Sequence, residues 1–134
     1  MLAEQILAIN ATTRKLCKNS ENGAIISQKM RFLYLVRNEI LAPKALVNEL
    51  CIAKPNLTIL ARTMVAEGLI EKMRADEDMR SVHYKITDKG LAELNRMIAA
   101  LEDSVTKQLN LDDNGVKKGE ELLETALNFL NGAL

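Results

Sequence analysis

The side chains best suited to bind another molecule lie on one face of a predicted helix over residues 54–67. At 100° per residue, apolar side chains gather on one side of that helix, at Leu57, Leu60, Ala61 and Met64. The opposite side is expected to expose Pro55, Ile59, Arg62 and Ala66, flanked by Asn56, Thr58 and Thr63, with Lys54 at the start of the helix. Such a face suits the major groove of DNA, where isoleucine can touch a thymine methyl group and arginine can pair with guanine or phosphate. Asparagine and threonine can bond bases or backbone. The alternative is an ordinary solvated face with one exposed isoleucine.

A second group of charged residues lies in a predicted hairpin over residues 69–87. Asp78 and Arg80 stand two residues apart in its loop, close enough for the carboxylate to orient the guanidinium. Lys72 and Arg74 fall on its first strand, where they can meet phosphates. The alternative is a solvated acidic turn, which the carboxylates at positions 76 and 77 favour because they repel phosphate.

Few residues in the chain suggest catalysis or metal binding. Cys17 lies in a basic segment that could stabilise a thiolate, so it is a candidate redox residue; a thiol without a role is the alternative. Cys51 is expected to pack beside Leu50, and His83, the single histidine, is expected to be exposed on the outer face of its strand. No nucleophile stands at a recognisable spacing from a histidine, and there is no glycine-rich phosphate loop. We therefore expect no enzyme, no cofactor and no metal site.

The elements that would position these residues follow from periodicity, caps and turn signals. A helix is predicted over 1–19, a turn at 20–23, a second helix from Ser27 to about Glu39 and a short helix from Pro43. Gly68 is expected to end the 54–67 helix, and strands are predicted over 69–74 and 81–87. Asp88 is expected to cap a long helix over 88–110, and Asp112 or Asp113 to cap a last one. This order, mainly α with a small β-hairpin, is that of a winged helix-turn-helix.

Length and composition are those of one compact domain. At 134 residues the chain has room for a single domain over 1–134 with an ordinary core. Hydrophobic residues make up 48% and charged residues 27%, which excludes a disordered chain. No apolar run approaches the ~20 residues that a bilayer span requires. The N-terminus lacks the order of a signal peptide, so we expect a cytoplasmic protein that does not bind membranes.

Charge is unevenly distributed although the formal net charge is zero. Residues 91–134 carry four Lys or Arg and eight Asp or Glu, a net −4, whereas residues 1–43 carry six against three, a net +3. A surface for a polyanion is therefore expected in the first two thirds of the chain.

Residues 43–90 resemble the MarR family of bacterial transcriptional regulators. The resemblance rests on Gly68-Leu69-Ile70, Lys72, Asp78-x-Arg80 and Ile86-Thr87-Asp88-Lys89-Gly90, which match the family's G-L-[IV]-x-[RK]…D-x-R…L-T-x-x-G stretch in order and spacing. The sequence departs from the family at Ala53, which replaces a frequent capping serine at a cost of about 1 kcal/mol. It departs again at Cys51, where glycine is frequent, and at Ile86, where leucine is usual.

The resemblance implies a homodimeric regulator of transcription that binds double-stranded DNA at a palindromic operator. We expect a repressor, and an activator is the alternative. It implies a DNA-binding lobe over 27–90, a connecting helix over 88–110, and dimerisation helices over 1–19 and 105–134. It also implies that Arg80 in the wing enters the minor groove and that a small-molecule or oxidant effector releases the DNA. The alternative function is a winged-helix module that binds protein without specific DNA binding.

Overall fold

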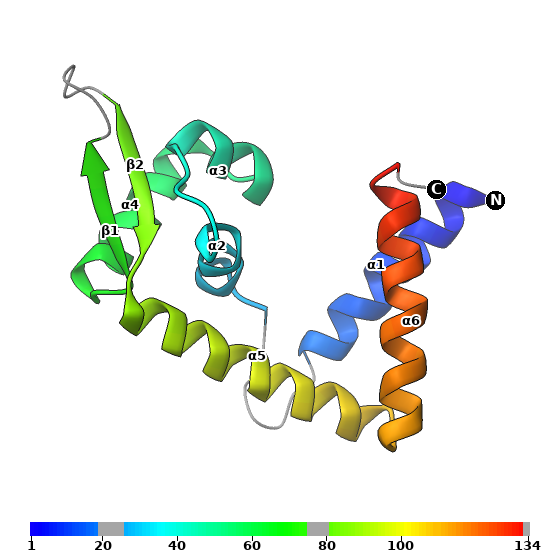
Figure 1. The fold of residues 1–134 in the computed structure, drawn as a ribbon. Helices are drawn as coiled ribbons and strands as arrows, with labels where there is room; N and C mark the ends of the chain where they lie inside the picture. The colour runs from blue at the N-terminus through cyan, green and yellow to red at the C-terminus, as the bar shows by residue number, and fades with distance from the viewer. Residues whose placement is uncertain (19–25, 75–80, 133–134) are drawn as a thin grey trace. The chain divides into compact units, whose positions relative to one another are not determined.

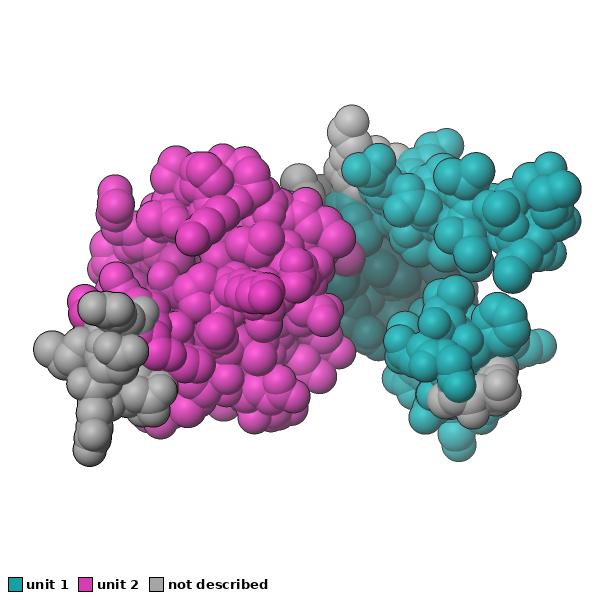
Figure 2. Space-filling view, turned by 90° about the horizontal axis from the view of Figure 1, so that it is seen from above, with its two compact units in different colours: residues 1–24, 101–134 teal, residues 25–100 magenta. Residues whose placement is uncertain are grey.

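The computed structural model describes residues 1–18, 26–74 and 81–132. Within these ranges it contains six helices and one two-stranded antiparallel sheet (Figure 1). The helices are α1 (Leu2–Lys18), α2 (Gln28–Val36), α3 (Pro43–Leu50), α4 (Lys54–Ala66), α5 (Asp88–Gln108) and α6 (Asp113–Leu130); the strands are β1 (Ile70–Arg74) and β2 (Val82–Ile86). The predicted fold class, mainly α with a β-hairpin wing, is confirmed. The chain divides into unit 1, residues 1–24 and 101–134, and unit 2, residues 25–100 (Figure 2).

Unit 2 contains the helix-turn-helix, the hairpin and most of the core. Its largest fully buried side chains are Phe32, Leu33, Val36, Leu46, Leu50, Leu57, Met64, Ile70 and Leu94. Among the described residues one ring pair contributes, Phe32 edge-on to Tyr84 with centroids 5.8 Å apart. The core is therefore aliphatic, as the low aromatic content predicts, and it joins α2, α3, α4 and the hairpin into one body.

Helix α2 begins as predicted and ends earlier than predicted. The Ser27 hydroxyl accepts the backbone N–H of Met30 at 3.1 Å and caps the helix. The helix stops at Val36, three residues before the predicted end at Glu39. The reason is a contact distant in sequence: Leu41 pairs with Tyr84 of β2 through N–H···O bonds of 3.1 and 2.8 Å, which requires extended backbone at Leu41. This bridge places Leu41 beside β2, on the edge of the strand that does not pair with β1.

The helix-turn-helix is formed by α3 and α4. Pro43 occupies the first turn of α3, as predicted, and Cys51 ends the helix in the left-handed conformation with φ of 53°. Helix α4 begins at Lys54 after Ala53, whose side chain makes no capping hydrogen bond. Gly68, with φ of 76°, then turns the chain from α4 into β1, which confirms its predicted role as the helix terminator.

The hairpin leads directly into α5. Its register pairs Ile70 with Ile86 and Lys72 with Tyr84. The predicted cap of α5 is wrong by one residue: Thr87 accepts the N–H of Gly90 at 2.9 Å, and Asp88 is the first helical residue. Position 90 must be glycine, because a Cβ atom there would lie 2.0 Å from the carbonyl oxygen of Leu69.

Unit 1 consists of α1, the end of α5 and α6. The Gln108 amide donates to the carbonyl of Leu16 at 2.8 Å and to the hydroxyl of the buried Ser104 at 2.9 Å. Asp112 caps α6 by accepting the N–H of Gly115 at 2.7 Å. Helix α6 contains no buried residue, although one side of it is rich in leucine. None of the described helices is long and apolar enough to cross a membrane.

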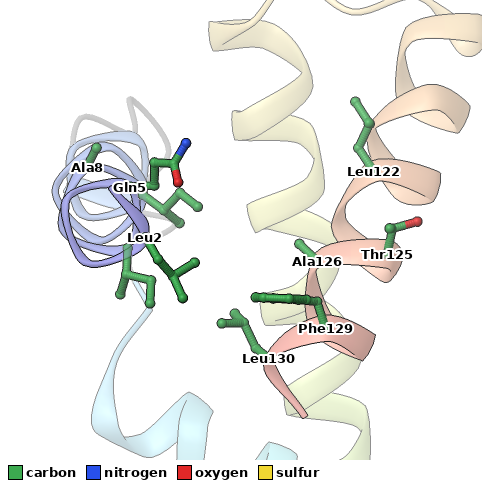
Figure 3. Close-up of a pocket in the computed structure, with 10 residues that line it drawn as sticks. Leu2, Gln5, Ala8, Leu122, Thr125, Ala126, Phe129 and Leu130 are labelled. Carbon is green, nitrogen blue, oxygen red and sulfur yellow. The ribbon is translucent and has the colours of Figure 1, made fainter. Parts of the chain in front are cut away.

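An apolar groove of about 670 Å³ lies between α1 and α6. In Figure 3, Leu2 and Gln5 point from α1 toward Phe129 and Leu130 of α6. Most of the other lining side chains are also apolar, so unit 1 by itself leaves a large hydrophobic surface exposed.

Candidate nucleic-acid interface

Helix α4 has one buried side and one exposed side, as its periodicity predicts. Leu57, Ala61 and Met64 are buried against the core of unit 2. The residues predicted to contact DNA are all exposed on this helix: Lys54, Pro55, Asn56, Thr58, Ile59, Arg62 and Thr63. The structure therefore brings these seven side chains together on a single accessible surface, which we call the outer face of α4. Their contact with DNA stays a prediction.

The polar groups of this outer face differ in whether the protein already uses them. Thr58 donates its hydroxyl to the carbonyl of Lys54, and Thr63 donates to the carbonyl of Ile59, both at 3.1 Å. Among the described residues, neither Asn56 nor Arg62 has a side-chain hydrogen bond or ion pair. The amide and the guanidinium, like the exposed ammonium of Lys54, are therefore available to form new polar contacts.

The C-terminal end of α4 is held by a set of polar contacts that we call the clasp. Lys29 of α2 forms an ion pair with Glu67, with Nζ to Oε distances of 2.8 and 3.1 Å. Lys89 of α5 donates to the carbonyl of Glu67 at 2.8 Å. Thr87 donates to the carbonyl of Gly68 at 2.6 Å while it caps α5. These bonds fix the end of α4 to α2, to the hairpin and to the start of α5.

The predicted phosphate contacts on β1 are exposed. Lys72 and Arg74 stand opposite Tyr84 and Val82, so their side chains share the face of the hairpin on which Tyr84 packs. Burial raises the pKa of the Tyr84 phenol, which is consistent with its place in the core. Lys72 and Arg74 extend beyond this core and can contact a ligand beside the hairpin.

The predicted pair in the wing, Asp78 and Arg80, lies outside the described residues. Their role in binding stays a prediction.

His83 and Cys51 do not lie as predicted. His83 is half-buried, not exposed, because it stands across from Met73 and neighbouring cross-strand side chains shield each other. Its Nδ1 atom is buried without a hydrogen-bond partner in the described part of the chain. Cys51 is exposed and not packed, since the left-handed backbone at the end of α3 turns it away from the side that buries Leu50; its thiol donates to the carbonyl of Asn48 at 3.4 Å.

Cys17 is half-buried near the end of α1, in unit 1. Its redox role stays a prediction. Across the described ranges, no group of three or more His, Cys, Asp or Glu side chains could hold a metal ion.

Comparison with solved structures gives the same fold over nearly the whole chain. Wild-type MarR from E. coli, in its apo form, has 24% identity and a TM-score of 0.69, with 95% of this chain and 97% of that one covered. The transcriptional regulator BldR from Sulfolobus solfataricus has 25% identity and a TM-score of 0.69, with 97% and 92% covered. A mutant of E. coli MarR complexed with operator DNA has 24% identity and a TM-score of 0.59, with 94% and 93% covered.

No family model matches the chain, and no curated protein matches its sequence. The structural likeness nevertheless defines the class: the protein is a winged helix-turn-helix. Within this class, its fold is the one found in the MarR regulators. This likeness confirms, for the fold, the resemblance seen in residues 43–90.

Proposed function

We propose that this chain is a sequence-specific DNA-binding regulator of transcription that acts as a homodimer. The observation that carries the proposal is the outer face of α4, where Asn56, Ile59 and Arg62 are exposed on a helix whose other side is buried. In a helix-turn-helix the second helix enters the major groove. A structural neighbour with the same fold was solved in complex with operator DNA, which supports DNA binding by this fold.

The proposed role of each side chain, in contacting bases or phosphates, follows from which part of the duplex it can reach. Arg62 and Asn56 offer free donors to base edges, and arginine pairs with guanine in a bidentate manner. Lys54, Lys72 and Arg74 are exposed cations that can neutralise phosphates and set the position of the protein on the duplex. Arg80 would add a contact in the minor groove, where narrow A·T tracts concentrate negative potential.

The proposed dimer is supported by the apolar surface of unit 1. Helix α6 buries none of its side chains within the chain, and the groove between α1 and α6 is lined almost entirely by apolar groups. Exposed apolar surface of this extent marks an interface. A second copy of the chain would cover it, and a two-fold dimer would match a palindromic operator with half-sites about one helical turn apart.

We further propose that the protein represses transcription and that a small-molecule or oxidant effector releases it from DNA. Cys17 is the candidate redox residue for an oxidant. These parts rest on the resemblance to MarR regulators. The alternative is a winged-helix module that binds protein, which the zero net charge of the chain favours.

The salt dependence of binding to mixed genomic DNA separates the two functions. Neutralising several phosphates gives a steep linear fall of log K with log salt, with a slope of about −0.9 per phosphate. We expect such a slope, followed by enrichment of a few genomic fragments on selection. Absence of DNA binding at low salt by the folded protein would overturn the proposal and favour the protein-binding module.

A further inference from the structure

The mid-line of the outer face of α4 is apolar, which is unusual for a helix exposed to water. At 100° per residue, Pro55, Ile59 and Ala66 fall within 40° of one another along the centre of this face. Ile59 is 61% exposed. Arg62 is the sole charged residue between Lys54 and Glu67, and it lies to one side of this line. The part of the helix that would enter a groove most deeply therefore offers methyl groups rather than charge.

The two threonines that flank this line make the surface still less polar. Each donates its hydroxyl proton to the helix backbone, Thr58 to Lys54 and Thr63 to Ile59. A threonine hydroxyl bonded to the carbonyl four residues earlier has no proton left for a ligand. What remains available is the side-chain methyl group and the lone pairs of the oxygen. Thr63 lies one turn after Ile59, so the two form one continuous patch.

One base edge in the major groove matches such a patch. Thymine presents a C5-methyl group there beside its O4 acceptor, whereas the other bases present hydrogen-bond donors and acceptors without a methyl group. A buried polar edge left without a partner is unfavourable, so an isoleucine placed against guanine or cytosine would weaken binding. The same isoleucine against a thymine methyl group buries apolar surface on both sides.

We propose that α4 reads thymine through its C5-methyl group, with Ile59 as the central contact and the methyl group of Thr63 beside it. This inference rests on the proposed DNA-binding function and states which base each operator half-site must contain opposite Ile59. Arg62 remains available for an adjacent guanine or phosphate. The apolar surface of a protein partner is the competing ligand for the same patch.

The test uses a duplex selected from a random-sequence DNA pool by the 134-residue chain. Each thymine is replaced singly by deoxyuridine, which keeps base pairing and removes only the methyl group. We expect at least one thymine in each half-site at which the replacement weakens binding roughly three- to five-fold, the effect of losing one buried methyl-sized group. Fluorescence anisotropy at fixed salt measures the change.

The variant Ile59→Ala tests whether Ile59 is the residue that senses the thymine methyl group. The variant should bind the thymine duplex more weakly than the wild type and should no longer distinguish it from the deoxyuridine duplex. A difference caused by altered DNA stiffness would persist in the variant. Ile40→Ala is the matched control: Ile40 is 49% exposed, lies outside α4 between α2 and α3, and should leave the discrimination intact.

Two substitutions at Thr63 separate its methyl group from its hydroxyl. Thr63→Val keeps a methyl group and loses the hydroxyl, whereas Thr63→Ser does the reverse. If the hydroxyl is committed to the helix, the valine variant should bind the selected duplex more tightly than the serine variant. Circular dichroism confirms that each variant folds.

The outcomes distinguish this inference from the proposed function. No selective DNA binding by the folded protein would overturn both and would favour a protein partner. Selective binding that is indifferent to deoxyuridine at every position would overturn methyl reading and leave the function standing. Discrimination that survives Ile59→Ala would overturn the assignment to Ile59.

Discussion

At the level of single residues, Arg62 and Lys72 carry the same charge but would meet different parts of a DNA duplex. Arg62 lies on the outer face of α4, which would enter the major groove. Lys72 lies on β1. In the proposed complex this strand would stand beside the duplex, where phosphates are the accessible anionic groups. Base contacts specify a sequence, whereas phosphate contacts position the protein. Replacing Arg62 should therefore change the preference for operator over random DNA, whereas replacing Lys72 should change the affinity for both.

Arg62→Ala should reduce the preference for operator over random DNA. A good bidentate pair is worth roughly 1–3 kcal/mol of discrimination, or about five- to 150-fold in the ratio of the two affinities. Arg62→Lys keeps the charge but not the planar donor pair, so it should lose most of the same preference. Anisotropy titrations on a selected duplex and its scrambled counterpart give the ratio. An unchanged ratio in folded Arg62→Ala would show that this residue does not read bases.

Lys72→Ala should weaken operator and random DNA about equally. The slope of log K against log salt should become shallower by roughly one unit, since one phosphate contact is lost. Lys85→Ala is the matched control, because Lys85 pairs with Glu71 and lies on the opposite face of the hairpin. Equal slopes for the wild type and Lys72→Ala would place the hairpin away from the DNA.

At the level of elements, the clasp determines how firmly α4 is attached to the rest of unit 2. Thr87 has two functions in it: its hydroxyl donates to the carbonyl of Gly68 and accepts the N–H of Gly90. The end of α4 and the start of α5 thus share one side chain. The ion pair between Lys29 and Glu67 is partly exposed and contributes less.

Thr87→Val should lower the free energy of unfolding by about 1–2 kcal/mol, the usual effect of removing a helix cap together with a second hydrogen bond. Thr87→Ser keeps the hydroxyl and should remain close to the wild type. Lys29→Ala should cost less than about 1 kcal/mol, because exposed ion pairs contribute little. Urea unfolding followed by circular dichroism measures all three. Equal stability of Thr87→Val and the wild type would mean that the clasp does not stabilise the fold.

The sequence predicts the elements of unit 2 well where the signal is local. The apolar spacing of Leu57, Ala61 and Met64 defines the buried side of α4 and thereby its outer face, and Gly68 marks its end. Alternation at Val82 and Tyr84 likewise marks β2.

What the sequence misses depends on contacts between distant residues. Helix α2 ends early because Leu41 pairs with Tyr84, and no local pattern encodes this bridge. The clasp joins Lys29 to Glu67, which are 38 residues apart. Thr87 and Asp88 are both good capping residues, so periodicity alone does not choose between them.

At the level of the whole molecule, the apolar side of α6 is left uncovered within the chain. The helix has 18 residues and buries none of them within the chain. Leu123 and Leu127, one turn apart, are 65% and 58% exposed. In the proposed dimer these side chains lie in the interface, and the spacing of the two α4 helices depends on it, since a palindrome is read by two copies at once.

Leu127→Glu should convert the dimer into a monomer, because the substitution places a charge in an interface that must otherwise exclude water. The fold of the chain should survive, since Leu127 is exposed in the single chain. Asn128→Glu is the matched control: it adds the same charge at the neighbouring position, which at 100° per residue lies on the polar side of α6. Sedimentation should give twice 14.9 kDa for the wild type and the control, and 14.9 kDa for Leu127→Glu. Operator affinity should fall with dimerisation, because the second half-site no longer benefits from the high effective concentration of a joined partner. A dimer that persists in folded Leu127→Glu would place the interface elsewhere on the molecule.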